Sequence, residues 1–501
     1  MPRRATLADV EIDVETRPKP VALETDPGDP FRILLLGNFS GRRNRGPSEL
    51  VSTERCPVLV DRDNFEAVMK KMAPRVTLAP ETADAPELDL QFTDLDHFHP
   101  DHLYDSLPVF AALRELRKKA DDPAAFRTLA AELAPSSPSQ PAPAVPEPEA
   151  FAAGSLLDQI LENEPRSSGA AASRRGDPMA SFLRSIVAPY LVPGRDPKQD
   201  DLVAHIDNTI SARMRAILHA DDFQALESLW RVVFFLTRRL ETGTDLKLYL
   251  LDLTREEFAE TLAGDDLRRS ELYRLLVDEV SVSGTPPWAV IATDYTFDNS
   301  IEDVELLGRI ALIAERARAP FLGRAHERVL GVSSLASSPD PHSWSTGNDP
   351  AWSILRELPE SRWLALALPR FLLRLPYGKE TSETEQFAFE EMEAAVRHES
   401  YLWGNPGFAC AMALGQAFSE YGWGMEPGAV LEVGGLPVHT FLEDGTSAMK
   451  PCAEVWLTDK AIEVITAKGL IPLISKKGSD SVRLGLFQSV CGTKLGGRWT
   501  S

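Results

Sequence analysis

A stretch rich in proline, serine, alanine and glutamate divides this chain of 501 residues into two unequal parts. Its sequence is PSSPSQPAPAVPEPEAFAAG, residues 135–154, and no apolar repeat of helical or strand period runs through it. This composition is typical of a solvated, semi-extended linker between folded units. We therefore predict an extended segment over 1–29, a first module over 30–134, the linker over 135–154, a helix and a weakly patterned segment over 155–200, and a second module over 201–501.

The first module alternates strand-like and helix-like patterns. The apolar run FRILLLGNF ends in a turn and predicts a buried strand, and ELDLQF alternates apolar and polar residues as a half-buried strand does. VLVDRDNFEAVMKKM predicts a strand that passes into a helix capped by Asp63 or Asn64. DSLPVFAALRELRKKADD has apolar residues at helical spacing. Together these patterns predict a small α/β unit.

The second module begins with a long helical stretch over 201–239. One face of this stretch carries apolar residues, namely Leu202, Ile206, Ile210, Met214, Ile217 and Leu218. Strand-like runs follow, separated in places by helices such as VELLGRIALIAERA; these runs are DLKLYLLDL, PWAVIATDY, WLALALPRFLLR and GLIPLISKK. The fold class predicted for the chain is α/β (α+β), with mixed sheets flanked by helices.

Charge, hydropathy and cysteine usage exclude several classes of protein. A formal charge of −22 with a pI near 4.9 repels the phosphates of nucleic acids and of anionic membranes. No apolar run reaches the length of about 18 residues that a membrane-spanning helix needs, and the first residues lack the apolar core of a secretory signal. The four cysteines lie far apart, as in proteins of reducing compartments. We therefore expect a cytoplasmic protein that binds no nucleic acid and does not insert into a membrane.

The segment DLDHFHPDHL, residues 94–103, suggests a metal site because it holds three of the nine histidines in the chain. Those histidines are His97, His99 and His102. Zinc needs two or three such ligands converging from rigid elements. A helix start explains the same residues: Pro100 at the first position, Asp101 at the positive end of the helix dipole, and Phe98 packed below. Because no second ligand cluster occurs elsewhere in the sequence, we favour the helix start and predict no bound metal.

Other segments lack complete catalytic or cofactor-binding motifs. GNFSGRRNRG follows a strand, as a phosphate-binding loop does, but lacks the GK[ST] ending. Glu390 and Glu391 in FAFEEMEAAVRHES are candidates for an acid and a base, yet we expect both to lie exposed on a helix. PRFLLRLPYG (369–378) and YLWGNP (401–406) are interpreted as packed turns, with binding loops as the alternative. No catalytic residue and no cofactor are predicted, and we do not expect an enzyme.

Longer motifs carry a family resemblance. FRILLLGNFSGR, VLVDRDNFEAVMKKMAPRVTL and ELDLQFTDLDHFHPDHLYDSLPVFAALRELRKK resemble the small sheath subunit of the bacterial type VI secretion system. Later stretches resemble the large sheath subunit and occur in that family's order. They are SLLDQIL, HIDNTISARMRAILHADDFQALESLWR, PPWAVIATDYTF, LPESRWLALALPRFLLRLPYG, YLWGNPGFACAMALGQAF and EVWLTDKAIEVITAKGLIPLISKKGSDSVRLGLFQS. The two resemblances cover residues 30–125 and 155–490. The chain is therefore similar to both subunits fused into one polypeptide.

This resemblance implies a structural protein. Paired small and large sheath subunits stack in a helical array around an inner tube, and contraction of the array propels that tube. Neighbouring protomers are joined by donated strands, a form of β-augmentation, and such open polymers need interfaces that do not close on themselves. The implied partners are further copies of the chain, the inner tube protein and the baseplate. The alternatives are a non-contractile sheath-like adaptor or cap in the same machine and, from a different class, a metal-dependent hydrolase built on the His97 cluster.

One short segment has a more specific implication. In this family SLLDQIL corresponds to the segment that an AAA+ unfoldase recognises when it dismantles contracted sheaths. Leu156, Leu157, Ile160 and Leu161 form the apolar face that the resemblance assigns to this contact, docked as a helix in a groove. The alternative is a short helix that packs on its own domain.

Overall fold

The computed structural model describes residues 6–7, 10–11, 26, 28–45, 55–79, 87–122, 125–126, 199–345, 347, 349–392, 398–443 and 445–500. The predicted linker and the predicted unfoldase-binding residues Leu156, Leu157, Ile160 and Leu161 lie outside the described residues.

The helices are α1 (Phe65–Met72), α2 (Pro100–Ser106), α3 (Pro108–Asp121), α7 (Gln199–Leu218), α8 (Asp221–Arg239), α9 (Arg255–Leu262), α10 (Glu271–Tyr273), α11 (Glu279–Ser283), α12 (Ile301–Ala317), α13 (Pro350–Glu357), α14 (Pro406–Tyr421) and α15 (Asp459–Ala467). The strands are β1 (Thr6–Leu7), β2 (Val10–Glu11), β3 (Phe31–Gly37), β4 (Val58–Val60), β5 (Arg75–Leu78), β6 (Leu88–Gln91), β7 (Leu246–Asp252), β8 (Val290–Phe297), β9 (Phe321–Ala325), β10 (Leu364–Leu368), β11 (Phe371–Leu372), β12 (Trp403–Gly404), β13 (Glu432–Val433), β14 (Thr440–Glu443), β15 (Thr446–Met449), β16 (Ile471–Ser475) and β17 (Val482–Leu484). None of the described helices is long and apolar enough to cross a membrane.

A nine-stranded mixed sheet organises the molecule, with the strand order β13-β17-β16-β10-β9-β8-β3-β7-β4. The strands from β7 through β3, β8, β9 and β10 to β16 run parallel. Antiparallel strands flank them, with β4 on one side and β17 and β13 on the other. Every residue of β3 is buried, as expected for a parallel strand covered on both faces.

Strand β3 unites the two parts of the chain in this one sheet. It comes from the part before the linker, but it lies between β7 and β8, which follow the linker. All seven residues of β3 are in register with β7, and β4 adds to the outer edge of β7. The apolar strand of the predicted first module therefore completes the core of the second part.

Two layers of helices cover the sheet. Ile33 and Leu35 of β3 belong to the core formed with α8 and α14, whereas Leu34 and Leu36 belong to the core formed with α12 and α13. This alternation follows from the two-residue period of a strand, which sends successive side chains to opposite faces. The predicted class, an α/β fold with a mixed sheet flanked by helices, is confirmed.

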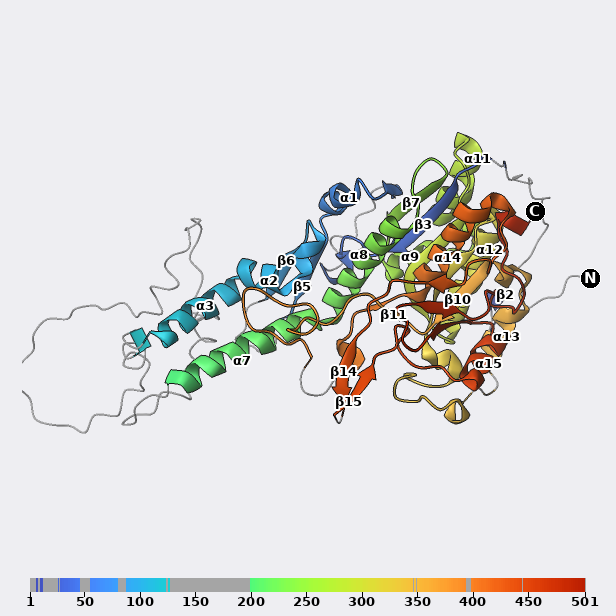
Figure 1. Cartoon of the computed structure of the whole chain (residues 1–501). Coiled ribbons are helices and arrows are strands. Elements are labelled where there is room, and N and C mark those ends of the chain that lie inside the picture. The colour runs from blue at the N-terminus through green and yellow to red at the C-terminus, as the bar shows by residue number, and fades with distance from the viewer. Residues whose placement is uncertain are drawn as a thin grey trace, which may run out of the picture.

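Helices α3 and α7 form an arm that extends away from the sheet (Figure 1). The two helices pack against each other, and the guanidinium of Arg117 donates to the carboxylate of Asp207, with Nε 2.6 Å from Oδ1. At the tip of the arm the side-chain amide of Gln199 donates to the carbonyl of Asp121 over 2.8 Å. The residues that flank the segment 123–198 on its two sides therefore lie next to each other.

The helical stretch predicted over 201–239 is divided. Helix α7 ends at Leu218 and α8 begins at Asp221, with extended backbone at Ala220 between them. Asp221 and Asp222 in the first turn of α8 favour a new helix start because carboxylates stabilise the positive end of the helix dipole. The predicted apolar face of α7 is buried as expected.

Local capping explains the entry to α1. Asn64 occupies the N-cap position but makes no side-chain capping bond. The carboxylate of Asp61 instead accepts the backbone N–H groups of Asp63 and Asn64, each over 2.9 Å. The predicted helix start is confirmed, with Asn64 rather than Asp63 at the N-cap position, and Asp61 supplies the side-chain hydrogen bonds that precede it.

The histidine-rich segment is a helix start. Nδ1 of His97 accepts the backbone N–H of Thr93 over 3.3 Å, and Nδ1 of His99 accepts the N–H of Asp101 over 3.2 Å as the cap of α2. The ring of His102 stacks on that of His97 with centroids 4.0 Å apart. Among the described residues, no group of three histidine, cysteine, aspartate or glutamate side chains is placed to hold a metal ion.

Candidate functional site

The hairpin of β14 and β15 projects from the body of the molecule (Figure 1). Within the described ranges, its two strands pair only with each other. The side chain of Leu442 is 77% exposed. An isolated two-stranded hairpin is marginally stable in water, and its unpaired edges can accept further strands. The hairpin is therefore a candidate site for strand addition.

The register of the hairpin shows which backbone groups face outward. The N–H of Lys450 donates to the carbonyl of His439 over 2.9 Å, so this pair is a hydrogen-bonded one. Because hydrogen-bonded and non-hydrogen-bonded pairs alternate along an antiparallel ladder, the pair of Leu442 and Ser447 is non-hydrogen-bonded. The N–H of Leu442 therefore points away from β15, and that of Ser447 points away from β14.

The base of the hairpin is fixed by polar contacts on both legs. On one leg, Nδ1 of His439 lies 2.6 Å from the hydroxyl of Tyr401. On the other, the ammonium of Lys450 donates to Nδ1 of His398 over 2.8 Å. Since an ammonium only donates, Nδ1 of His398 is the acceptor, and Nε2 donates its proton to Glu454 over 2.9 Å. These contacts hold the projecting strands in one orientation.

A buried ion network joins Arg374 to two glutamates. The guanidinium of Arg374 donates to Glu391, with Nη1 2.7 Å from Oε2, and to Glu227 of α8, with Nε 2.9 Å from Oε1. Although burial opposes ionisation, Arg374 and hydrogen bonds from His219 and the Tyr377 N–H lower the pKa of Glu391 to about 2. The expectation that Glu391 lies exposed on a helix is therefore wrong, because the segment around it is irregular and the carboxylate is buried.

The same segment joins the two parts of the chain. The backbone N–H groups of Glu385 and Gln386 donate to the carboxylate of Asp101 in α2, over 2.9 and 3.0 Å. The ring of Phe387 stacks on Tyr104 of α2 with centroids 4.4 Å apart. Residues 374–391 therefore link α8, through Arg374, to the first part of the chain.

The remaining sequence candidates serve packing. In GNFSGRRNRG, Arg42 pairs with Asp252 over 3.0 Å and with Glu257 over 2.8 Å, so its charge is used inside the fold. In YLWGNP, Tyr401 and Trp403 are buried, and in PRFLLRLPYG Arg370 pairs with Glu454 over 2.6 Å. The two aromatic segments contribute the paired strands β11 and β12, and both also border a cavity.

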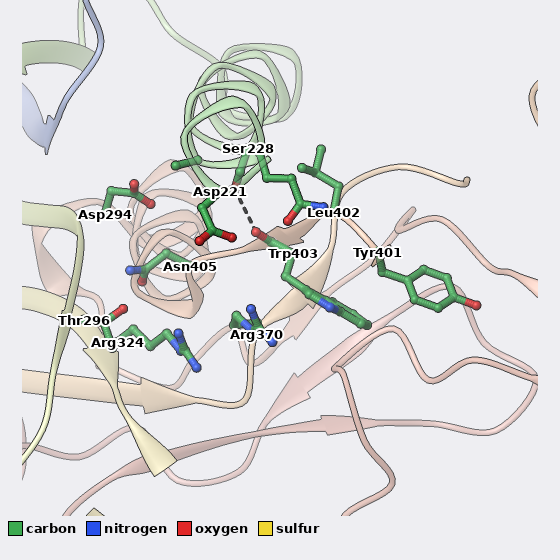
Figure 2. Close-up of a pocket in the computed structure, with 12 residues that line it drawn as sticks. Asp221, Ser228, Asp294, Thr296, Arg324, Arg370, Tyr401, Leu402, Trp403 and Asn405 are labelled. Atoms are coloured by element: carbon green, nitrogen blue, oxygen red, sulfur yellow. Dashed lines mark hydrogen bonds between the residues drawn. The ribbon is translucent and has the colours of Figure 1, made fainter. Parts of the chain in front are cut away.

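Two adjoining cavities lie at the carboxyl ends of the central strands, with volumes of about 200 and 270 Å³. They share Ala225 of α8 and Asp294 and Thr296 of β8 as lining residues, and we call them together the Asp294 cavity. Figure 2 shows the carboxylates of Asp221 and Asp294 on one side of the smaller cavity and the guanidiniums of Arg324 and Arg370 on the other.

Asp294 is expected to reduce stability at high pH. Burial raises the pKa of its carboxyl to about 7, an effect that Arg324 only partly opposes. The folded state therefore holds the proton more tightly than the unfolded state, and this contribution to stability is lost as the pH rises from about 4 to 7. Asp294→Asn is expected to raise the free energy of unfolding by about 1 kcal/mol more at pH 8.5 than at pH 6. Urea unfolding at the two pH values measures this, and an equal or smaller effect at pH 8.5 contradicts the assignment.

Sequence reasoning missed the hairpin, the partners of Arg374 and the Asp294 cavity. For the hairpin a signal exists, because TFLE and TSAM flank the pair Asp-Gly, which is a preferred two-residue hairpin turn. The ion network and the cavity have no local signal, since their members come from distant parts of the sequence.

Comparison with known proteins gives matches on both sides of the linker. Residues 200–491 match the VipB family, described as an EvpB tail sheath N-terminal domain, and residues 10–125 match the VipA family of the type VI secretion system. The type VI secretion system sheath protein TssC1 of Pseudomonas aeruginosa is 36% identical over 295 residues, which are 56% of this chain and 59% of that protein. The chain thus spans about three fifths of the length of this curated relative.

Proposed function

Because this chain belongs to the sheath family of type VI secretion systems, with a small-subunit and a large-subunit region in one polypeptide, we propose that it is the protomer of a contractile sheath. In this proposal, copies polymerise helically around an inner tube on a baseplate, in the bacterial cytoplasm, and contraction propels the tube. The role is structural and requires no catalytic residue.

The single observation that carries the proposal is the projecting hairpin. Both of its outer edges lack a strand partner among the described residues, and its legs are fixed to the body through Tyr401 and His398. A strand added by a neighbouring copy extends the backbone ladder without a change in either body. A donor strand from another part of the neighbour makes the contact head-to-tail, and such contacts generate helical polymers.

The fixed internal geometry supports contraction by rotation of rigid bodies. The contacts of Asp101 with residues 385 and 386 and the shared β3 strand bind both parts of the chain into one body. Strand connections between such bodies keep their main-chain hydrogen bonds while the bodies rotate. We therefore propose that contraction changes the contacts between copies and leaves each copy intact.

Proline substitutions in the hairpin are expected to block polymerisation. Leu442→Pro removes an outward N–H of β14, and Ser447→Pro removes one of β15, without deleting a hydrogen bond inside the hairpin. One of the two edges receives the neighbour's strand, and the proline variant on that edge is expected to block polymer formation. The fraction of the protein that pellets in ultracentrifugation is expected to fall at least tenfold for that variant. Leu442→Ala keeps the N–H and serves as the control.

The outcome also tests the alternative role. If the unmodified chain stays in the supernatant as discrete particles in the presence of its inner tube protein, it acts as the non-contractile adaptor or cap. If it pellets and neither proline variant changes this, the hairpin is not the assembly site.

We further propose that residues 155–163 bind the AAA+ unfoldase through Leu156, Leu157, Ile160 and Leu161, as the family resemblance implies. Deleting residues 155–163 is expected to leave polymer formation unchanged and to abolish binding to the unfoldase in a pull-down. Unchanged binding after the deletion refutes this assignment.

A further inference from the structure

The Asp294 cavity lies where the sheet reverses its winding. The chain places β7 on one side of β3 and then β8 on the other side, after which β9, β10 and β16 continue outward in that second direction. The connections on either side of β3 therefore leave in opposite directions, and a crevice opens at the carboxyl ends of β3 and β8. Asn38, directly after β3, and Asp294 of β8 both line the larger cavity at this point. In open α/β sheets this is the position where ligands bind.

A bulge in β8 directs Asp294 into the crevice. Ala292 of β8 lies opposite Leu322 of β9, but Thr296 lies opposite Arg324, so four steps along β8 match two steps along β9. The three residues between Ala292 and Thr296 have no regular partner in β9, and Asp294 is the central one of the three. Bulges occur next to functional sites, where they redirect a side chain.

The cavity has unused hydrogen-bonding groups of opposite kinds at its two ends. In the smaller cavity, Nε2 of Gln224 and Nε of Arg324 are buried donors without an acceptor among the described residues. In the larger cavity, Oδ1 of Asn38 is a buried acceptor without a donor in the same part of the chain. Asp294 borders both cavities. Buried polar groups are normally paired with protein or with ordered water, so a molecule bound in the cavity replaces water at these groups when it pairs with them.

A ligand with a single charge does not fit this arrangement. A lone cation beside Asp294 leaves the donors of Gln224 and Arg324 unpaired, and a lone anion at those donors faces the carboxylates of Asp221 and Asp294. A molecule with an ammonium and a carboxylate group satisfies both ends at once. The adjoining volumes of about 200 and 270 Å³ suit a molecule of amino-acid size.

We propose that the Asp294 cavity binds a small zwitterion of the α-amino acid class, whose ammonium lies at Asp294 and Asn38 and whose carboxylate lies at Gln224 and Arg324. This inference goes beyond the role as a sheath protomer and does not depend on it, since the hairpin contributes no residue to the cavity.

Saturation-transfer NMR on the full-length protein tests the proposal, because the method reads binding to free protein and to polymer alike. The probes are the twenty L-α-amino acids, each tested alone. At least one is expected to bind saturably with a Kd below about 1 mM. Its N-acetyl derivative, which lacks the ammonium, and its methyl ester, which lacks the carboxylate, are each expected to bind at least tenfold more weakly.

Variants at the two ends of the cavity complete the test. Asp294→Asn and Gln224→Leu are each expected to weaken binding of the same amino acid at least tenfold. Glu302→Gln, which changes an exposed carboxylate outside the cavity, is the control and is expected to leave binding unchanged. The thermal unfolding midpoint of each variant verifies that it is folded. The proposal is overturned if no amino acid binds saturably, if both blocked derivatives bind as well as the parent, or if binding survives in both cavity variants.

Discussion

Residues 199–501, produced without the first part of the chain, are expected to aggregate. Their sheet lacks β3, so β7 and β8 lose the strand that lies between them. Five apolar side chains of β3 are fully buried, namely Phe31, Ile33, Leu34, Leu35 and Leu36. At about 2 kcal/mol for each, their burial contributes roughly 10 kcal/mol, which is comparable to the whole stability of a typical domain. The soluble fraction after expression measures the effect.

Production of residues 1–134 in the same cells is expected to restore a soluble complex. The linker is not needed to hold the parts together, because β3 lies inside the sheet of the second part and Gln199 contacts Asp121 across the tip of the arm. A protease site inserted within residues 135–154 is the matched control, and the two cleaved fragments are expected to elute together in gel filtration. A soluble, monodisperse 199–501 fragment would falsify the shared-sheet account.

Arg374→Met is expected to lower the free energy of unfolding by about 3–5 kcal/mol, because the buried carboxylate of Glu391 loses its arginine and Glu227 keeps only Arg231. The double variant that adds Glu391→Gln is expected to regain most of the loss, since the carboxyl that lost its arginine is then uncharged and Glu227 keeps its pair with Arg231. Arg114→Met, which breaks the exposed pair with Asp105, is the control and is expected to cost at most about 1 kcal/mol. Urea unfolding of all three proteins supplies the comparison.

The effect of Arg374→Met depends on pH in a defined direction. In the native protein the lowered pKa of Glu391 gives a contribution to stability that is present above its ordinary pKa and is lost as the pH falls toward about 2. Without Arg374, burial favours the protonated carboxyl. The deficit of the variant is therefore expected to shrink between pH 8 and pH 5. A deficit that grows over this range shows that Arg374 does not hold these charges.

Local patterns predict the elements well where the residues within the element decide its structure. The continuous apolar run of FRILLLG predicts a strand buried on both faces, and β3 has this burial. Alternation in LDLQ predicts the half-buried β6, and Pro100 marks the start of α2. The family resemblance, carried by long motifs on both sides of the linker, is confirmed by matches to both sheath families.

Long-range placement was not predictable from the same patterns. Nothing within FRILLLG indicates that its neighbours are strands more than 200 residues further along the chain. The local sequence around Glu390 and Glu391 predicts two solvated carboxylates. It is the ion pair with Arg374, a tertiary contact, that stabilises Glu391 in the interior. Asp294 likewise lies within an ordinary strand sequence, and the bulge that turns it toward the cavity depends on its pairing with β9. Such features arise from tertiary contacts, which a single sequence does not display.

Negative-stain electron microscopy of the purified full-length chain, together with its inner tube protein, tests the central claim most directly. The account predicts long hollow tubes built from repeated copies of the chain. Uniform discrete particles at the same concentration, with the tube protein left unsheathed, contradict it.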